Sequence, residues 1–406
     1  MVASVGSPVP VEDPCQPLLK GSVSKVNTAH PLHQNPRCKL PAAVRSGACW
    51  PICLLPLAIW AGYRQWSPVL VFVYNLFAII ALSACIFDSS LQLATRASEP
   101  WGALINIGAG NAVGLSLGAW AVASREISVA QSLAMGAILA DILLVLGSCL
   151  LAASHRADIL FFDQPVTRAL SSLMLVTAMV LVLPSVLSLS VPYELGDQTV
   201  AVSRGTSAVL LFVYAGYLYF QLGTHRHLFH HDGENMGNDA DADTEAAHPS
   251  RSAPQTRTQA FLTLTLALLA TLLCTKYLTE TLVRTAVQTH FSETLLATVL
   301  VPVASTVAPA MAMIQTSATS QDVGAAISAG VQTVVHVALF RMPVLVLLGW
   351  ALGSPMSLVV DPFQTVVLLF SVVLVHGLLH GGKYSVMHGL ALIAMYAILG
   401  LAFCVR

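Results

Sequence analysis

Residues 108–147 read GAGNAVGLSLGAWAVASREISVAQSLAMGAILADILLVLG, and this stretch decides the fold class. It contains two apolar segments, each long enough to cross a bilayer as a helix, joined by a short polar turn. Small residues recur in it at four-residue spacing, which lets a neighbouring helix approach closely. Asn111 and Asp141 lie inside the apolar segments, where an unpartnered amide costs about 1–3 kcal/mol and a charged carboxylate costs more. The stretch therefore predicts a membrane protein with a polar site between its helices.

The composition of the whole chain agrees with this interpretation. Of its 406 residues, 56% are hydrophobic and 10% are charged, whereas soluble domains carry about 25% charged residues. A net charge of −1 leaves no basic surface that would neutralise phosphates, which argues against a nucleic-acid partner. No constellation typical of an enzyme remains outside the apolar segments. We therefore expect a protein that is not an enzyme, that has no cofactor and that is surrounded by membrane lipid.

Apolar runs predict an all-α polytopic membrane protein with about 11 transmembrane helices. They divide as one extra, short helix near 49–63 and two sets of five. The predicted domains are a disordered tail over 1–48, the extra helix and first repeat over 49–224, a linker over 225–259, and the second repeat over 260–406.

An odd number of helices per repeat inverts the second repeat relative to the first, and such transporters bind their substrate at the midplane between the repeats. The linker carries six carboxylates between Asp232 and Glu245, and we interpret it as solvated chain rather than as a calcium sensor. The tail has five basic residues against two acidic ones, so the positive-inside rule favours a cytosolic N-terminus.

The motifs around Asn111 resemble the first signature of the calcium/proton exchangers, in which G-N-A-V is followed by glutamate. Here Gly114 takes the place of that glutamate. The resemblance continues from Gln131 through MGAILADILLVLG, where Ala140-Asp141 replaces the serine-asparagine pair of the family. It extends over roughly 50–406, through Ser203–His225, His336–Leu358 and the terminal GGKYSVMHGLALIAMYAILGLAF.

The family's second signature, L-P-I-V-G-N-A-A-E-H, is the place where this chain departs most. Val301-Pro302-Val303 is followed by ASTVAPAMAMIQTSATSQD, so the second glutamate position falls on Pro309 or Ala310. No carboxylate occurs between Glu293 and Asp322. We expect Pro309 to break its helix and free carbonyl groups near the midplane.

The resemblance implies a member of the cation/calcium antiporter superfamily that sits in a vacuolar or similar membrane and moves Ca²⁺ out of the cytosol in exchange for protons. It implies a cation site with Asn111 and Asp141 in one half, and Ser305 and Thr306 in the other. Asp141 and His336 are the candidates for proton coupling. The transported cation and protons are then the partners, and the oligomeric state stays open.

Several alternatives remain at this point. Asp141 is either a functional carboxylate or a protonated, hydrogen-bonded acid. The glycines serve either an ion site or helix packing alone. Arg341, which lies in a long apolar segment, could pair with Asp141 and close the site. Calcium takes about six to eight oxygen ligands, usually with several carboxylates. Loss of both glutamates therefore predicts weaker calcium binding, altered selectivity, a different cation or small metabolite as substrate, or a membrane protein without transport activity.

Overall fold

Long apolar helices make up nearly all of the described chain. The structure is a computed structural model that describes residues 50–154, 160–161, 164–190, 196–224, 256–320, 323–381 and 383–405. The predicted tail over 1–48 and most of the predicted linker lie outside the described residues. Within them, ten helices are long and apolar enough to cross a membrane, and the shorter apolar helix Leu54–Tyr63 precedes them. The predicted fold class, with one extra helix and five spans in each half, is confirmed.

The first half begins with the extra helix. Its elements are α2 (Trp50–Tyr63), α3 (Pro68–Ala94), α4 (Glu99–Ala123), α5 (Ile127–Leu139), the π-helical turn η1 (Ala140–Val145), α6 (Leu146–Ser154), strand β1 (Leu160–Phe161), α7 (Gln164–Ser190), α8 (Gly196–Tyr219) and η3 (Phe220–Thr224).

The second half repeats this order. Its elements are α9 (Arg257–Thr289), α10 (Glu293–Leu295), η5 (Leu296–Leu300), α11 (Val301–Ser320), α12 (Gly324–His336), η6 (Val337–Arg341), α13 (Met342–Ala351), α14 (Pro362–His380), strand β2 (Lys383–Tyr384) and α15 (Val386–Val405). The two short strands pair antiparallel and connect the halves.

Helix ends follow local chemistry. Prolines occupy the first turns of α3, α4 and α14, where the missing N–H costs nothing. Thr256 and Gln259 form a capping box at the start of α9, and the Asp361 carboxylate accepts hydrogen bonds from two backbone N–H groups of α14. Arg125 and His290, which follow helices α4 and α9, have positive φ and turn the chain sharply.

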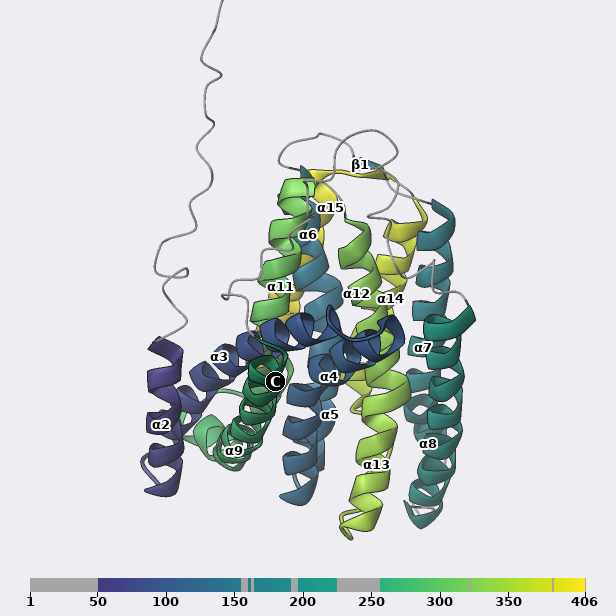
Figure 1. Cartoon of the computed structure of the whole chain (residues 1–406). Coiled ribbons are helices and arrows are strands. Elements are labelled where there is room, and N and C mark those ends of the chain that lie inside the picture. The colour runs from purple at the N-terminus through teal and green to yellow at the C-terminus, as the bar shows by residue number, and fades with distance from the viewer. Residues whose placement is uncertain are drawn as a thin grey trace, which may run out of the picture. The chain divides into compact units, whose positions relative to one another are not determined.

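Two helices with a π-helical turn in the middle bring the halves together. The helix α5–η1–α6 and the helix α12–η6–α13 run in opposite directions (Figure 1), as inverted repeats require. A π-helical turn interrupts the regular helix locally and is frequent at functional sites. η1 contains Asp141 and η6 ends at Arg341, so each half contributes one ionisable residue from its own π-helical turn.

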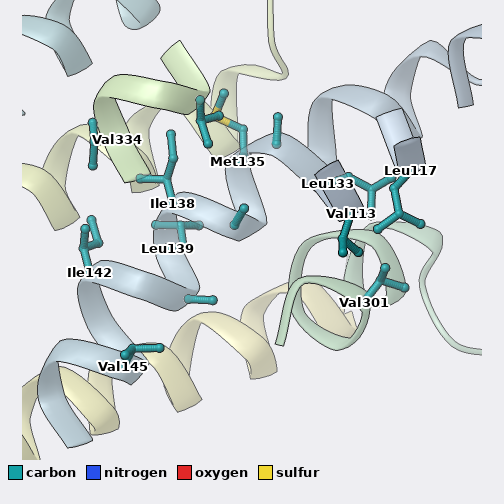
Figure 2. Packing of buried hydrophobic residues seen from close by; sticks show 14 of the residues in the cluster. Val113, Leu117, Leu133, Met135, Ile138, Leu139, Ile142, Val145, Val301 and Val334 are labelled. Atoms are coloured by element: carbon teal, nitrogen blue, oxygen red, sulfur yellow. The ribbon is translucent and has the colours of Figure 1, made fainter. Parts of the chain in front are cut away.

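The buried core lies around these helices. Figure 2 shows Val113 and Leu117 of α4 gathered with Leu133 of α5 and Val301 of α11. These side chains are at most 5% exposed. Large apolar side chains elsewhere point outward, including Phe212 at 81% exposed, as expected for surfaces that face lipid rather than water. The core therefore includes both halves, and the outer surface is suited to a bilayer.

The backbones of the two halves approach each other closely at Gly136 in α5. A Cβ atom placed there would collide with the Thr298 carbonyl of η5 and would lie 2.7 Å from Cγ of Pro302. Only glycine fits at this position, because the obstacle is backbone and cannot rotate away.

We expect Gly136→Ala to lower the free energy of unfolding by about 1–3 kcal/mol, the usual cost of overpacking. Thermal unfolding of the detergent-solubilised protein measures this. Gly216→Ala on α8 is the matched control, because no atom lies within 4 Å of the added methyl group. The control should be neutral or gain up to about 1 kcal/mol from the better helix propensity of alanine. Equal losses in both variants would contradict the close approach at Gly136.

Candidate functional site

Asp141 lies between the two halves. It is partly buried in η1, in the middle of the span Ile127–Ser154. Its carboxylate accepts a hydrogen bond from the Thr333 side chain of α12 and interacts electrostatically with Arg341 of η6. The phenol of Tyr396 on α15 also interacts with it. All three partners belong to the second half, so Asp141 is the contribution of the first half to a shared polar site.

Arg341 supplies the positive charge of this site. Its side chain is 7% exposed, and its Nη2 donates a hydrogen bond of 3.3 Å to Oδ1 of Asn111 on α4. Its Nε has no hydrogen-bond partner among the described residues. The sequence left open whether Arg341 pairs with Asp141. In the structure the charge of each acts on the other, and the guanidinium donates its hydrogen bond to Asn111. The negative charge of Asp141 therefore acts on the guanidinium, while one guanidinium donor, Nε, stays without a hydrogen bond among the described residues.

Gly114 makes room for that guanidinium. A Cβ atom built on Gly114 would lie 2.6 Å from both Nη1 and Nη2 of Arg341. This is the position at which the exchangers' first signature has glutamate. The chain has thus lost a carboxylate there and has filled the same space with a cationic group.

Both polar atoms of the Asn111 side chain are hydrogen-bonded. Its Nδ2 donates to the carbonyl oxygen of Ile107 one turn earlier, at 2.9 Å, and its Oδ1 accepts from Arg341. Helix α4 continues unbroken from Glu99 to Ala123. The glycines beside Asn111 therefore do not open the backbone in this structure. Gly114 instead admits the side chain of Arg341, and Gly118 admits that of Leu345.

Ser305 and Thr306 lie elsewhere. Both hydroxyls donate to the Pro302 carbonyl of their own helix, at 2.8 and 3.1 Å. Ser305 and Pro309 line a cavity of about 60 Å³ between α3, α4 and α11, together with Ser90 and Asn106. This cavity adjoins Gly110 and so touches both signature stretches.

The expected break at Pro309 is wrong. Helix α11 runs from Val301 to Ser320 with Pro309 inside it. Proline still lacks the N–H that would bond to the carbonyl of Ser305, so one carbonyl is freed of its helical partner without a break. Tight packing of α11 against α3 and α6 holds the helix together across this gap.

His336 is turned toward α8. Its Nδ1 lies 3.1 Å from the hydroxyl of Tyr214, and its ring packs edge-on against Tyr214 and Tyr217. The resemblance implied that His336 would lie with Ser305 and Thr306 in the second half of the cation site. In the structure its ring instead contacts Tyr214 and Tyr217 of α8. The aromatic pair provides a hydrogen-bond partner and an apolar wall for a buried imidazole.

The ligands around Asp141 are few for a divalent metal. Among the described residues, no group of three or more His, Cys, Asp or Glu side chains comes together. A cation about 4 Å from a fixed guanidinium would also meet a repulsion of about 4 kcal/mol per unit charge at an effective dielectric constant of 20. Thr333 and Tyr396 were not foreseen, because a single threonine or tyrosine in an apolar helix carries no signal of its own.

Comparison with known proteins decides the family. The family model described as sodium/calcium exchanger protein matches residues 67–223 and again 259–405. The chain belongs to this family. A vacuolar calcium ion transporter of Schizosaccharomyces pombe is 30% identical over 354 residues, which is 87% of this chain and 83% of that protein. A Ca²⁺/H⁺ antiporter of Aphanothece halophytica is 27% identical, over 87% of this chain and 94% of that protein.

Solved structures agree on the fold. The structure of native YfkE superposes with a TM-score of 0.72 at 22% identity, and covers 87% of this chain and 98% of its own. The H⁺/Ca²⁺ exchanger CAX gives a TM-score of 0.63 at 14% identity, over 89% of this chain and 92% of its own. The chain is thus an integral membrane protein of an exchanger family whose characterised members are transporters.

We expect Arg341→Met to destabilise the protein by about 3–5 kcal/mol, because it leaves the Asp141 carboxylate buried without its compensating charge. Asp141→Asn combined with Arg341→Met should cost clearly less than the sum of the two single changes, with a coupling of about 0.5–3 kcal/mol. Unfolding free energies of the four proteins in detergent give the cycle. Strictly additive losses would show that the two residues do not interact.

Proposed function

We propose that this protein is a cation/proton antiporter of the calcium/proton exchanger type. It acts in a vacuolar or similar acidic membrane, has its N-terminus in the cytosol, and moves cations out of the cytosol in exchange for protons. Ca²⁺ is the cation named for the relatives. The two glutamate positions are taken by Gly114 and by Pro309 or Ala310, and this predicts an altered selectivity. The observation that carries the proposal is Asp141, a carboxylate in a π-helical turn at the interface of two inverted halves.

Asp141 is suited to hold a proton and a cation alternately. A carboxylate inside a bilayer needs a positive partner, so loss of the proton favours binding of a cation in its place. Its surroundings come from α12, η6 and α15, all in the second half. A movement of one half relative to the other therefore changes these contacts directly, which links exchange at the carboxylate to alternating access.

The position of Arg341 favours one competing function, a membrane protein that has kept the scaffold without transport. A fixed guanidinium beside Asp141 competes with every incoming cation. Two observations support transport over this alternative. The hydrogen bond from Arg341 to Asn111 is long, at 3.3 Å, and the Arg341 Nε has no partner among the described residues. The carboxylate of Asp141, a residue that is only partly buried, therefore stays open to an incoming cation while Arg341 keeps its place.

In liposomes that contain the purified protein and an acidic interior, we expect an external cation to dissipate the pH gradient. A pH-sensitive dye follows this while Ca²⁺, Mg²⁺, Na⁺ and K⁺ are added in turn. Asp141→Asn should abolish the response to every cation, because the exchanged proton has lost its carrier. An unaltered response in Asp141→Asn, or no response of the correctly inserted wild type to any cation, would rule out the proposal.

His336 is the other candidate for proton coupling, and its contacts argue for a supporting role. Because its ring faces Tyr214 rather than Asp141, we expect His336→Gln to keep the cation-driven loss of the pH gradient that Asp141→Asn abolishes. The two variants are compared in the same liposome assay at equal protein content. Complete loss in His336→Gln, with normal thermal stability, would instead assign the proton pathway to the histidine.

A further inference from the structure

The site has a different charge from the one that the family pattern implies. Two glutamates facing each other balance one divalent cation or two protons, and the buried charge is zero in either state. In this chain Gly114 occupies the first glutamate position and Pro309 or Ala310 the second, and Asp141 is the carboxylate at the interface. Arg341 adds a fixed positive charge next to it.

The charges can be counted state by state. With Asp141 ionised and no bound cation, Arg341 makes the site neutral. A bound monovalent cation brings the buried charge to +1, and a divalent cation brings it to +2. A proton on Asp141 also gives +1. One proton exchanged for one monovalent cation therefore leaves the buried charge unchanged, whereas one proton exchanged for Ca²⁺ does not.

Geometry points the same way as charge. The guanidinium occupies the space beside Gly114 in which a family glutamate and its cation would stand, and it is bonded to Asn111, the remaining polar residue of the signature. Among the described groups that interact with Asp141, Thr333 and Tyr396 carry neutral hydroxyls and Arg341 carries a charge. Neutral oxygens and one carboxylate suit a singly charged ion better than a doubly charged one.

We propose that Arg341 determines the substrate class. It stands in place of one positive charge of the transported cation, so that the site takes monovalent cations such as Na⁺ or K⁺ in preference to Ca²⁺. This inference rests on the proposed function, because it names the cation that the antiporter exchanges. Arg341 bonds to Asn111 at the site and its charge acts on Asp141, so it selects the substrate by charge in addition to stabilising the fold.

The test compares Arg341→Gln with Arg341→Lys in the liposome assay. Glutamine keeps a donor for Asn111 and removes the charge, whereas lysine keeps the charge and changes the shape. For wild type we expect half-maximal exchange at a Na⁺ or K⁺ concentration below that for Ca²⁺. Arg341→Gln should lower the Ca²⁺ requirement by about tenfold or more, since it removes a repulsive unit charge. Arg341→Lys should keep the monovalent preference.

A second variant and a second measurement make the test independent of transport rate. Gly114→Glu combined with Arg341→Gln places a second carboxylate in the space that the guanidinium leaves. Ca²⁺ should raise the melting temperature of this variant and of Arg341→Gln, but not that of the wild type. A ligand that binds the folded state stabilises it by an amount that grows with the logarithm of its concentration over Kd, so the shift in melting temperature reports binding directly.

The outcomes separate the two proposals. A wild type that exchanges Ca²⁺ for protons at least as well as Na⁺ or K⁺, or an Arg341→Gln protein with an unchanged ratio of Ca²⁺ to Na⁺ response, overturns the role of Arg341 and leaves the antiporter intact. A wild type without any cation-driven proton movement overturns the antiporter, and the assignment of substrate class falls with it.

Discussion

Two opposite charges inside an apolar helix bundle constrain this structure more than any other feature. Asp141 and Arg341 come from different halves of the chain, and the charge of each acts on the other. Burying either charge inside the bilayer region without the other would cost several kcal/mol. Their pairing fixes how η1 and η6 face each other, and Asn111 fixes the position of α4 against both. Gly114 is part of the same constraint, because any side chain there would occupy the space of the guanidinium.

The inverted arrangement explains why these groups meet. η1 and η6 occupy equivalent places in helices that run in opposite directions (Figure 1). A symmetric carrier would place like residues in both turns, and two like charges would repel. Here the first half presents a carboxylate and the second a guanidinium, so the halves attract across their interface. The approach of α5 to η5 at Gly136 shows how closely the surrounding backbones are packed.

Much of the fold could be predicted from the sequence, because length and hydropathy alone set the spans. Ten spans and the short first helix appear as the apolar runs predict, and Asn111 and Asp141 were marked by their polarity in apolar runs. The direction in which a side chain points could not be predicted from the sequence. The sequence places His336 inside an apolar run, yet the orientation of its ring depends on Tyr214, which lies 122 residues away. Likewise, proline at position 309 predicts a broken helix only until packing against other helices is included.

The substitutions at the signature positions form a consistent set when charge is considered. Replacing a glutamate by Gly114 alone would leave a cavity and remove a ligand, and Arg341 without Asp141 would be a buried, unpaired charge. Together with Asp141, which replaces an asparagine of the family, Gly114 and Arg341 give a site that is neutral before any ion binds. A carrier with unpaired carboxylates depends on its substrate for neutrality, whereas this one supplies its own counter-charge. The stability of the unloaded site and its selection of the substrate's charge thus have the same cause.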